Sequence, residues 1–138
     1  MRSSVTVNLM TADNPFQNFS EAELNGIAEQ NGFKRKGSRN WIRRTSELVQ
    51  LLNLQKSQWA ADAHYLNFAL WPLVFGEPPS LAESKFPFRI RGGSIGANDL
   101  EEFFAVIGKI GTLDDLRNLQ RSRKMPALIT KPLLELLA

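Results

Sequence analysis

Residues 33–71 read FKRKGSRNWIRRTSELVQLLNLQKSQWAADAHYLNFALW, and this stretch decides the fold. It contains three runs rich in strand-forming residues, which short polar turns separate. Ahead of them, residues 33–36 can add an edge strand whose lysines discourage unwanted strand pairing. Because short turns join strands that pair antiparallel, the stretch predicts a β-meander. The three runs span residues 40–44, 47–56 and 64–71.

The leucines of the second and third runs predict their register. Side chains alternate between the two faces of a strand, so pairing Asn53 with Asn67, and Gln55 with Tyr65, gathers these leucines on one face. A shift by one residue would scatter them. The expected core face carries Leu48, Leu52, Leu54, Leu66, Phe68 and Leu70. The opposite face carries Val49, Leu51, Asn53, Gln55, Tyr65, Asn67, Ala69 and Trp71.

The orientation of the first run stays open. Its connection to the second run allows two registers, so Trp41 and Arg43 point either to the core face or to the opposite face. Trp41 is large enough to stabilise the domain by burial in both registers.

The clearest helix start precedes the strands. Ser20 and Glu23 have the spacing of a capping box, in which each side chain accepts the other residue's free backbone N–H. Phe19 and Leu24 have the spacing of a hydrophobic staple. The pattern predicts a helix over residues 21–31.

The second half of the chain predicts helices that cover the sheet. The strongest signal is residues 99–110, where apolar residues form one helical stripe and Asn98 and Glu101 repeat the capping-box spacing. The other predicted elements are a strand at residues 88–91, a helix at 113–121 that starts with Thr112 and Asp115, and a short helix from residue 131.

Length and composition indicate one domain over residues 1–138, because 138 residues with 43% apolar content can bury a core of their own. The expected fold is α+β: an antiparallel β-meander of about four or five strands, with an N-terminal helix and C-terminal helices packed on one face. The absence of cysteine excludes disulfides and thiolate metal sites, and it fits a cytoplasmic location. No apolar run is long enough to predict a membrane span, and the N-terminus is too polar for a signal peptide.

The strand stretch also resembles a known family. The segments GFKRKG, NLQKS-x-W and YLN are similar to the bacterial domain of unknown function 4304 family. The resemblance covers about the first half of the chain, with a weaker match at residues 88–92. It implies a small α+β domain and no catalytic residues. The matching residues are Gly32, Phe33, Lys34, Lys36, Gly37, Asn53, Leu54, Gln55, Lys56, Ser57, Trp59, Tyr65 and Asn67.

Signals for catalysis or metal binding are weak. His64 is the only histidine, and with Asp62 it provides two ligands where a metal site needs three or four. The glycines at 92, 93 and 96 precede a helix but have neither the GxGxxG spacing nor the GK[ST] ending of phosphate-binding loops. The sequence therefore predicts no catalytic residue, no metal and no other cofactor.

The sharpest charge feature is the basic hairpin, residues 33–44. No acidic residue occurs between Glu29 and Glu47, although the net charge of the whole chain is only +3. Cations beside an exposed aromatic ring can hold a nucleic-acid backbone and stack a base. The alternative is a solvated edge whose charges prevent unwanted strand pairing. The candidate nucleic-acid-binding residues are Lys34, Arg35, Lys36, Arg39, Trp41, Arg43 and Arg44.

The second candidate surface is the polar part of the face opposite the core. Carboxamides cost free energy to bury without partners, so their alignment indicates either a hydrogen-bonded ladder under a helix or an open recognition surface. Aromatic anchors ringed by polar groups favour a protein partner. We therefore expect a non-enzymatic binding or interaction domain first, a nucleic-acid-binding module second, and an enzyme of unrecognised type third. The candidate partner-binding residues are Asn53, Gln55, Tyr65, Asn67 and Trp71.

Overall fold

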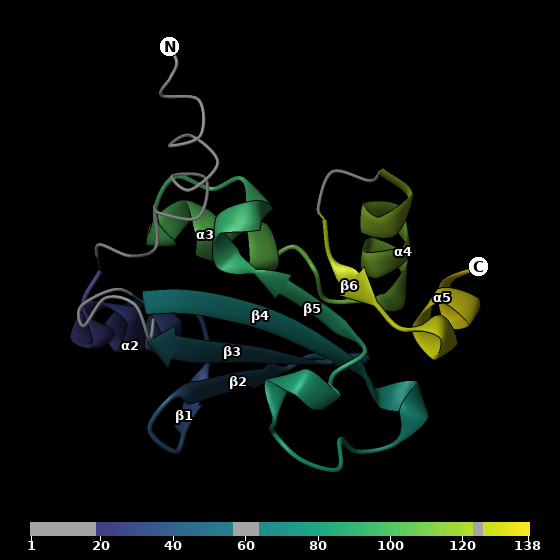
Figure 1. The fold of residues 1–138 in the computed structure, drawn as a ribbon, viewed down its shortest axis with the longest axis horizontal. Coiled ribbons are helices and arrows are strands. Elements are labelled where there is room, and N and C mark those ends of the chain that lie inside the picture. The colour runs from purple at the N-terminus through teal and green to yellow at the C-terminus, as the bar shows by residue number, and fades with distance from the viewer. Residues whose placement is uncertain (1–18, 57–63, 123–125) are drawn as a thin grey trace.

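The computed structural model describes residues 19–56, 64–122 and 126–138. Within these ranges, six strands form one antiparallel sheet in which the spatial order is the chain order, β1 to β6 (Figure 1). Among the described residues, one helix precedes the sheet, and the other helices lie in the C-terminal half. The predicted α+β meander is confirmed, with six strands where four or five were expected.

The strands lie close to their predicted positions, and the sheet gains one strand that was not expected. That strand, β6, pairs with β5 through Phe88 and Ile129, and Thr130 N–H extends the pairing with a bond to Pro87 O (2.9 Å). The strands are β1 (Lys34–Lys36), β2 (Asn40–Arg44), β3 (Leu48–Lys56), β4 (His64–Pro72), β5 (Phe88–Arg91) and β6 (Leu128–Ile129).

The register of β3 and β4 is the predicted one, with Asn53 opposite Asn67 and Gln55 opposite Tyr65. The register of β2 resolves the alternative that the sequence left open. Trp41 lies opposite Leu52, so the Trp41 side chain points to the core face, where none of its surface is exposed.

All four described α-helices contribute side chains to the cluster that buries the leucine-rich face of the sheet. Their contacts include an edge-on packing of Phe103 against Phe68, with ring centroids 6.3 Å apart. The prediction that the helices pack on one face is therefore confirmed. The helices are α2 (Glu21–Gln30), α3 (Leu100–Ile107), α4 (Leu113–Ser122) and α5 (Lys131–Leu137).

The helix starts follow the predicted chemistry, with one correction. The capping box of α2 is present, since Glu23 N–H donates to Ser20 Oγ (3.0 Å). The predicted cap of α3 is wrong by one residue: Asp99, not Asn98, accepts the N–H of Glu102 (2.8 Å). The carboxylate of Glu102 in turn accepts the N–H of Asn98 (3.2 Å). Both Asn98 and Asp99 are good cap residues with a glutamate three positions later, so spacing alone does not choose between them.

In the described part of the chain, the face opposite the core, here called the second face, is covered at one end, and at the other end only its margin is contacted, where Asn40 Nδ2–H donates to Leu81 O (3.5 Å). The chain between β4 and β5 folds back over it, and Phe86 packs against Val49, Leu51 and Ala69 in a separate apolar cluster. No α-helix contributes to that cluster among the residues described. The second face therefore has a covered end and an open end. This connection contains the short 3₁₀ turns η2 (Leu73–Phe75) and η3 (Glu83–Lys85).

The start of α4 predicts how stability depends on pH. The Asp115 carboxylate accepts the N–H groups of Gly111 (2.9 Å) and Thr112 (3.0 Å), and these bonds, chiefly that from Gly111, lower the pKa of Asp115. A pKa lowered by folding stabilises the domain above the ordinary aspartate pKa, and the contribution disappears as pH falls through the folded value. Asp115→Asn is therefore expected to lower the free energy of unfolding by about 0.5–1.5 kcal/mol at neutral pH and by less in acid. Urea denaturation of both proteins at neutral and acidic pH tests this, and an equal difference at both would contradict it.

Candidate functional site

A row of carboxamides crosses the open end of the second face. Asn53 Nδ2–H donates to Asn40 Oδ1 (2.9 Å), and Asn67 Nδ2–H donates to both Asn53 Oδ1 (3.2 Å) and Gln55 Oε1 (3.1 Å). These four residues form the amide ladder. Asn67 is only 7% exposed, whereas Asn53 is half-buried and Gln55 is exposed. The ladder therefore satisfies its buried member internally and still presents a polar edge to solvent.

Tyr65 lies beside the ladder, and its ring contacts the positively charged side chain of Arg91. The Arg91 guanidinium lies 4.2 Å from the centroid of the Tyr65 ring. Tyr65 is half-buried, so part of its ring stays accessible. The open sheet face, defined as the amide ladder with Tyr65 and Arg91, thus combines hydrogen-bonding groups, an aromatic ring and a positive charge.

Trp71, the fifth predicted partner-binding residue, lies at the other end of the second face. It lies six positions after Tyr65 on β4, which is roughly 20 Å along a strand. Its Nε1–H donates to Gly76 O (2.7 Å), and its ring packs edge-on against Phe75 and Phe86. The structure therefore joins Trp71 to the covered end and does not bring it to Tyr65.

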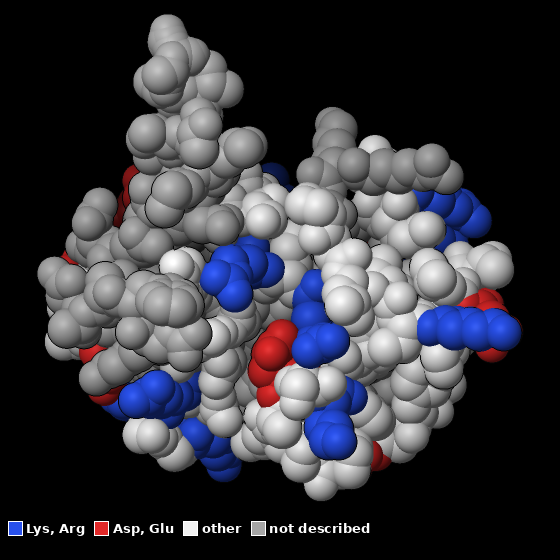
Figure 2. Space-filling view, viewed as in Figure 1, with Lys and Arg blue, Asp and Glu red and all other residues white. Residues whose placement is uncertain are grey.

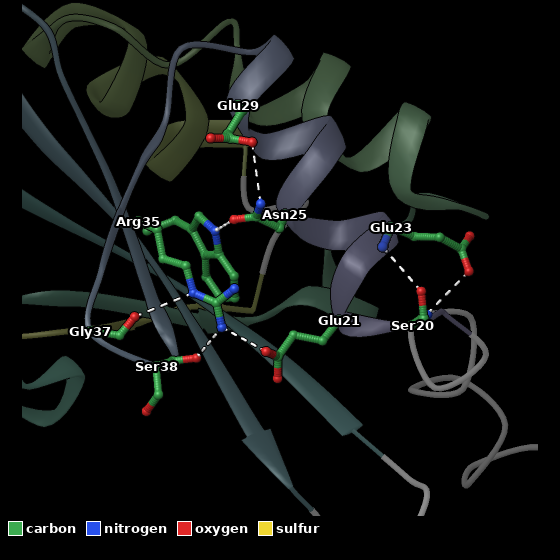
Figure 3. A network of polar contacts seen from close by, with 9 residues as sticks. Ser20, Glu21, Glu23, Asn25, Glu29, Arg35, Gly37 and Ser38 are labelled. Atoms are coloured by element: carbon green, nitrogen blue, oxygen red, sulfur yellow. Dashed lines mark hydrogen bonds and ion pairs between the residues drawn. The ribbon is translucent and has the colours of Figure 1, made fainter.

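In the basic hairpin, the guanidinium of Arg35 is already bonded to other groups of the domain. Figure 3 shows its guanidinium between the hairpin turn and α2, where it pairs with Glu21 (2.6 Å) and donates to Ser38 O (2.6 Å). The same guanidinium lies 4.9 Å from the Trp41 ring. Trp41 is completely buried and donates its Nε1–H to Asn25 Oδ1 (2.8 Å), so it offers no exposed ring for stacking.

Arg43 and Arg44 are also engaged. Arg43 Nε–H donates to Gln50 Oε1 (2.7 Å), and burial lowers the pKa of Arg43. Arg44 pairs with Glu77, and their hydrogen bond raises the pKa of Arg44 and lowers that of Glu77. Both members of that pair are well exposed, so the pair adds little stability.

The exposed cations that remain in the hairpin are Lys34, Lys36 and Arg39. Lys34 lies opposite Ile42 and Lys36 opposite Asn40, which places both lysines on the second face. Figure 2 shows Lys and Arg side chains gathered at the lower left of the view and near its centre, with acidic side chains between them.

Two further cations lie at the other margin of the open sheet face. Arg89 pairs with Ala69 and Arg91 with Asn67, while Phe88 and Ile90, which alternate with the arginines, point into the core. The sequence predicted this strand at residues 88–91 but did not assign its arginines to a site. The open sheet face is therefore flanked by positive charge on both sides.

The described residues provide no obvious catalytic or metal site. No group of three His, Cys, Asp or Glu residues among them could hold a metal ion. A hollow of about 700 Å³ between α2 and α3 includes Glu23, Asp99 and Glu101 in its lining, of which the first two cap helices. Asp62 lies outside the described residues, as does the side chain of His64. In the described part of the chain, no helix is long and apolar enough to cross a membrane.

Comparison with known proteins agrees with the resemblance of the strand segments. The family model named domain of unknown function (DUF4304) matches residues 24–129, which is most of the chain. No curated protein and no solved structure gives a match. Of the family-like residues, Asn53, Gln55, Tyr65 and Asn67 meet on the open sheet face, while Ser57 and Trp59 lie outside the described residues. The chain belongs to the DUF4304 family.

Proposed function

We propose that the protein is a non-enzymatic binding domain that holds a protein partner against its open sheet face. The amide ladder is the observation that carries this proposal. All described α-helices pack on the other face. The loop with Phe86 packs on the far end of this one and reaches the ladder only at its margin, where Asn40 Nδ2–H donates to Leu81 O (3.5 Å). A bacterial, cytoplasmic setting is part of the proposal, because a cysteine-free chain suits a reducing compartment.

The ladder prepares this surface for binding. A buried amide needs hydrogen-bond partners, and Asn67 finds both of its acceptors within the ladder. Those bonds hold Asn53 and Gln55 in place, so less side-chain entropy is lost when a partner binds. Tyr65 adds the kind of aromatic contact that commonly provides much of the binding energy at protein interfaces.

Truncating Tyr65 is expected to weaken partner binding by about 2 kcal/mol, with little dependence on salt. Wild type, Tyr65→Ala and the control Asn118→Ala, at an exposed position on α4, are immobilised and exposed to native lysate. Quantitative mass spectrometry then identifies proteins that wild type and the control retain and Tyr65→Ala loses. Equal retention by all three folded proteins would contradict the proposal.

Nucleic-acid binding is the second candidate, supported by the exposed residues Lys34, Lys36 and Arg39 at the sheet edge. Three phosphate contacts would give a log–log slope of affinity against salt of about −2 to −3. This candidate would be favoured over a protein partner if wild type retained nucleic acid with such a slope and the binding were lost in a triple variant. The triple variant carries Lys34→Ala, Lys36→Ala and Arg39→Ala. Truncation of Tyr65 would then have little effect.

A further inference from the structure

A hollow of about 270 Å³ adjoins the open sheet face between β5 and the loop that covers the other end. Its lining includes Gln55 and Asn67 from the amide ladder, Arg89 and Arg91 from β5, and Glu83 from the loop. The volume lies just below the usual range of pockets for small-molecule ligands. It suits a single side chain or a chain end rather than a nucleotide or a cofactor.

Arg89 has an unmet hydrogen-bonding need at this hollow. Its Nε–H is buried and has no acceptor, which is unusual for a charged group inside a folded protein. Arg89 forms no ion pair with any other described residue. The Nε atom is shielded from solvent, so water does not serve as its acceptor. A ligand in the hollow that Arg89 lines could provide one if the guanidinium turned toward it.

Arg91 is held in place by a contact that leaves its donors available. The Tyr65 ring lies 4.2 Å from the centre of the guanidinium. A cation–π contact occupies no hydrogen-bond acceptor, so the N–H groups of Arg91 that point away from the ring can still donate to a ligand. Arg89 and Arg91 are two positions apart on β5, so both side chains project from the same face of the strand.

We propose that this hollow binds a carboxylate of the protein partner, an inference that rests on the proposed function of the open sheet face. A planar carboxylate can accept two parallel bonds from one guanidinium, and side-on binding would satisfy the buried Nε–H of Arg89. Glu83 in the lining disfavours a doubly charged phosphate more than a singly charged carboxylate. The lysines at the opposite margin of the face add to the attraction for an acidic partner.

Glu83 is the natural competitor of the ligand. It is half-buried, lines the same hollow and forms no ion pair with either arginine. Its charge has the same sign as the ligand's, so Glu83→Gln is expected to strengthen carboxylate binding. That direction distinguishes a ligand site from a structural pair in which Glu83 simply neutralises Arg89.

The test follows the arginine Nε–Hε NMR signals of the full chain during titration with a capped Gly-Glu-Glu-Gly peptide at millimolar concentration. The matched control peptide carries glutamine in place of glutamate. A capped tri-glycine peptide with a free C-terminus tests the chain end as the source of the carboxylate, and inorganic phosphate tests the other anion. The protein variants are Arg89→Lys, Glu83→Gln and, as a control on the hairpin, Arg39→Lys.

The Arg89 signal is expected to shift with the glutamate peptide or the free chain end, and not with the glutamine peptide. Arg89→Lys keeps the charge but loses the two parallel N–H donors of the guanidinium. The dissociation constant of the glutamate peptide, followed through the Arg91 signal, should therefore rise by about tenfold, which is about 1.4 kcal/mol. It should fall in Glu83→Gln and stay unchanged in Arg39→Lys. No shift, an equal shift with the glutamine peptide, a shift with phosphate alone, or unchanged affinity in Arg89→Lys would each overturn the proposal.

The titration needs no partner, so its failure is separate from failure of the proposed function. A lysate protein that Tyr65→Ala loses, combined with an Arg89 signal that no carboxylate moves, would overturn the carboxylate site and leave the binding face standing. Binding of the glutamate peptide without any Tyr65-dependent partner would establish the site and count against the proposed function.

Discussion

Replacement of Gln50 by leucine is expected to lower the free energy of unfolding by about 2–4 kcal/mol, although leucine is the more hydrophobic residue. Gln50 lies on the core face of β3 and is completely buried. Its Nε2–H₂ group donates to Ile107 O (3.2 Å) and Ile110 O (2.6 Å), and its Oε1 accepts from Arg43 Nε–H (2.7 Å). One amide thus satisfies three polar groups from two distant parts of the chain.

The cost comes from the groups left behind. Ile107 O, at the end of α3, would keep only the bond from Ile110 N–H (3.1 Å), and Ile110 O, three residues beyond the helix, would lose the amide donor. Arg43 would lose the acceptor of its Nε–H in a site where burial already lowers its pKa. Leucine offers these groups nothing, so their desolvation is uncompensated.

Urea denaturation of wild type, Gln50→Leu and Gln30→Leu measures the effect. Gln30 is an exposed glutamine at the end of α2, so its replacement should change the free energy of unfolding by no more than about 0.5 kcal/mol. If Gln50→Leu were as stable as Gln30→Leu, the three hydrogen bonds would contribute nothing to stability.

Gln50 also illustrates what the sequence does and does not predict. Alternation predicted the register of β3 and β4, because only one pairing gathers the leucines of both strands on one face. The same alternation places Gln50 between Leu48 and Leu52, and a polar residue at a core position was a signal that was not used. Its acceptors lie 57 and 60 residues away, and local patterns contain no information about such partners.

Other features were missed for local reasons. β6 has only two residues, so it has no pattern of its own and exists only by pairing with β5. The amide ladder was predicted as either covered or open. It proves to be hydrogen-bonded internally, with none of the described helices above it, because the connection with Phe86 packs on the other end of the second face and touches the ladder only at its margin. How far that connection reaches depends on packing, which composition does not predict.

The orientation of Trp41 was the alternative with the largest functional consequence. An exposed Trp41 would have been a stacking platform in the basic hairpin. A register that places Trp41 opposite Leu52 makes it a core residue instead. The short turn between β2 and β3 permits both arrangements, so only the packed sheet distinguishes them.

Trp41→Ala is therefore expected to destabilise the domain by about 3–5 kcal/mol, because it removes a fully buried aromatic side chain and leaves a cavity. It also leaves Asn25 Oδ1 without the indole donor and Arg35 without the ring it lies against. Trp41→Phe should retain most of the packing and lose about 1 kcal/mol with the hydrogen bond. The control is Arg39→Ala, at an exposed position in the same hairpin, whose effect on stability should be within about 0.5 kcal/mol.

Urea denaturation of these variants, combined with a nucleic-acid binding assay, separates stability from recognition at the hairpin. If Trp41 acts only in the core, Trp41→Phe stays folded and binds any nucleic-acid ligand with the affinity of wild type. Arg39→Ala then lowers the affinity for that ligand without unfolding the domain. A wild-type stability for Trp41→Ala would instead mean that the indole leaves the core in solution. The hairpin would then present the exposed aromatic ring that base stacking requires, and the nucleic-acid candidate would gain over a protein partner.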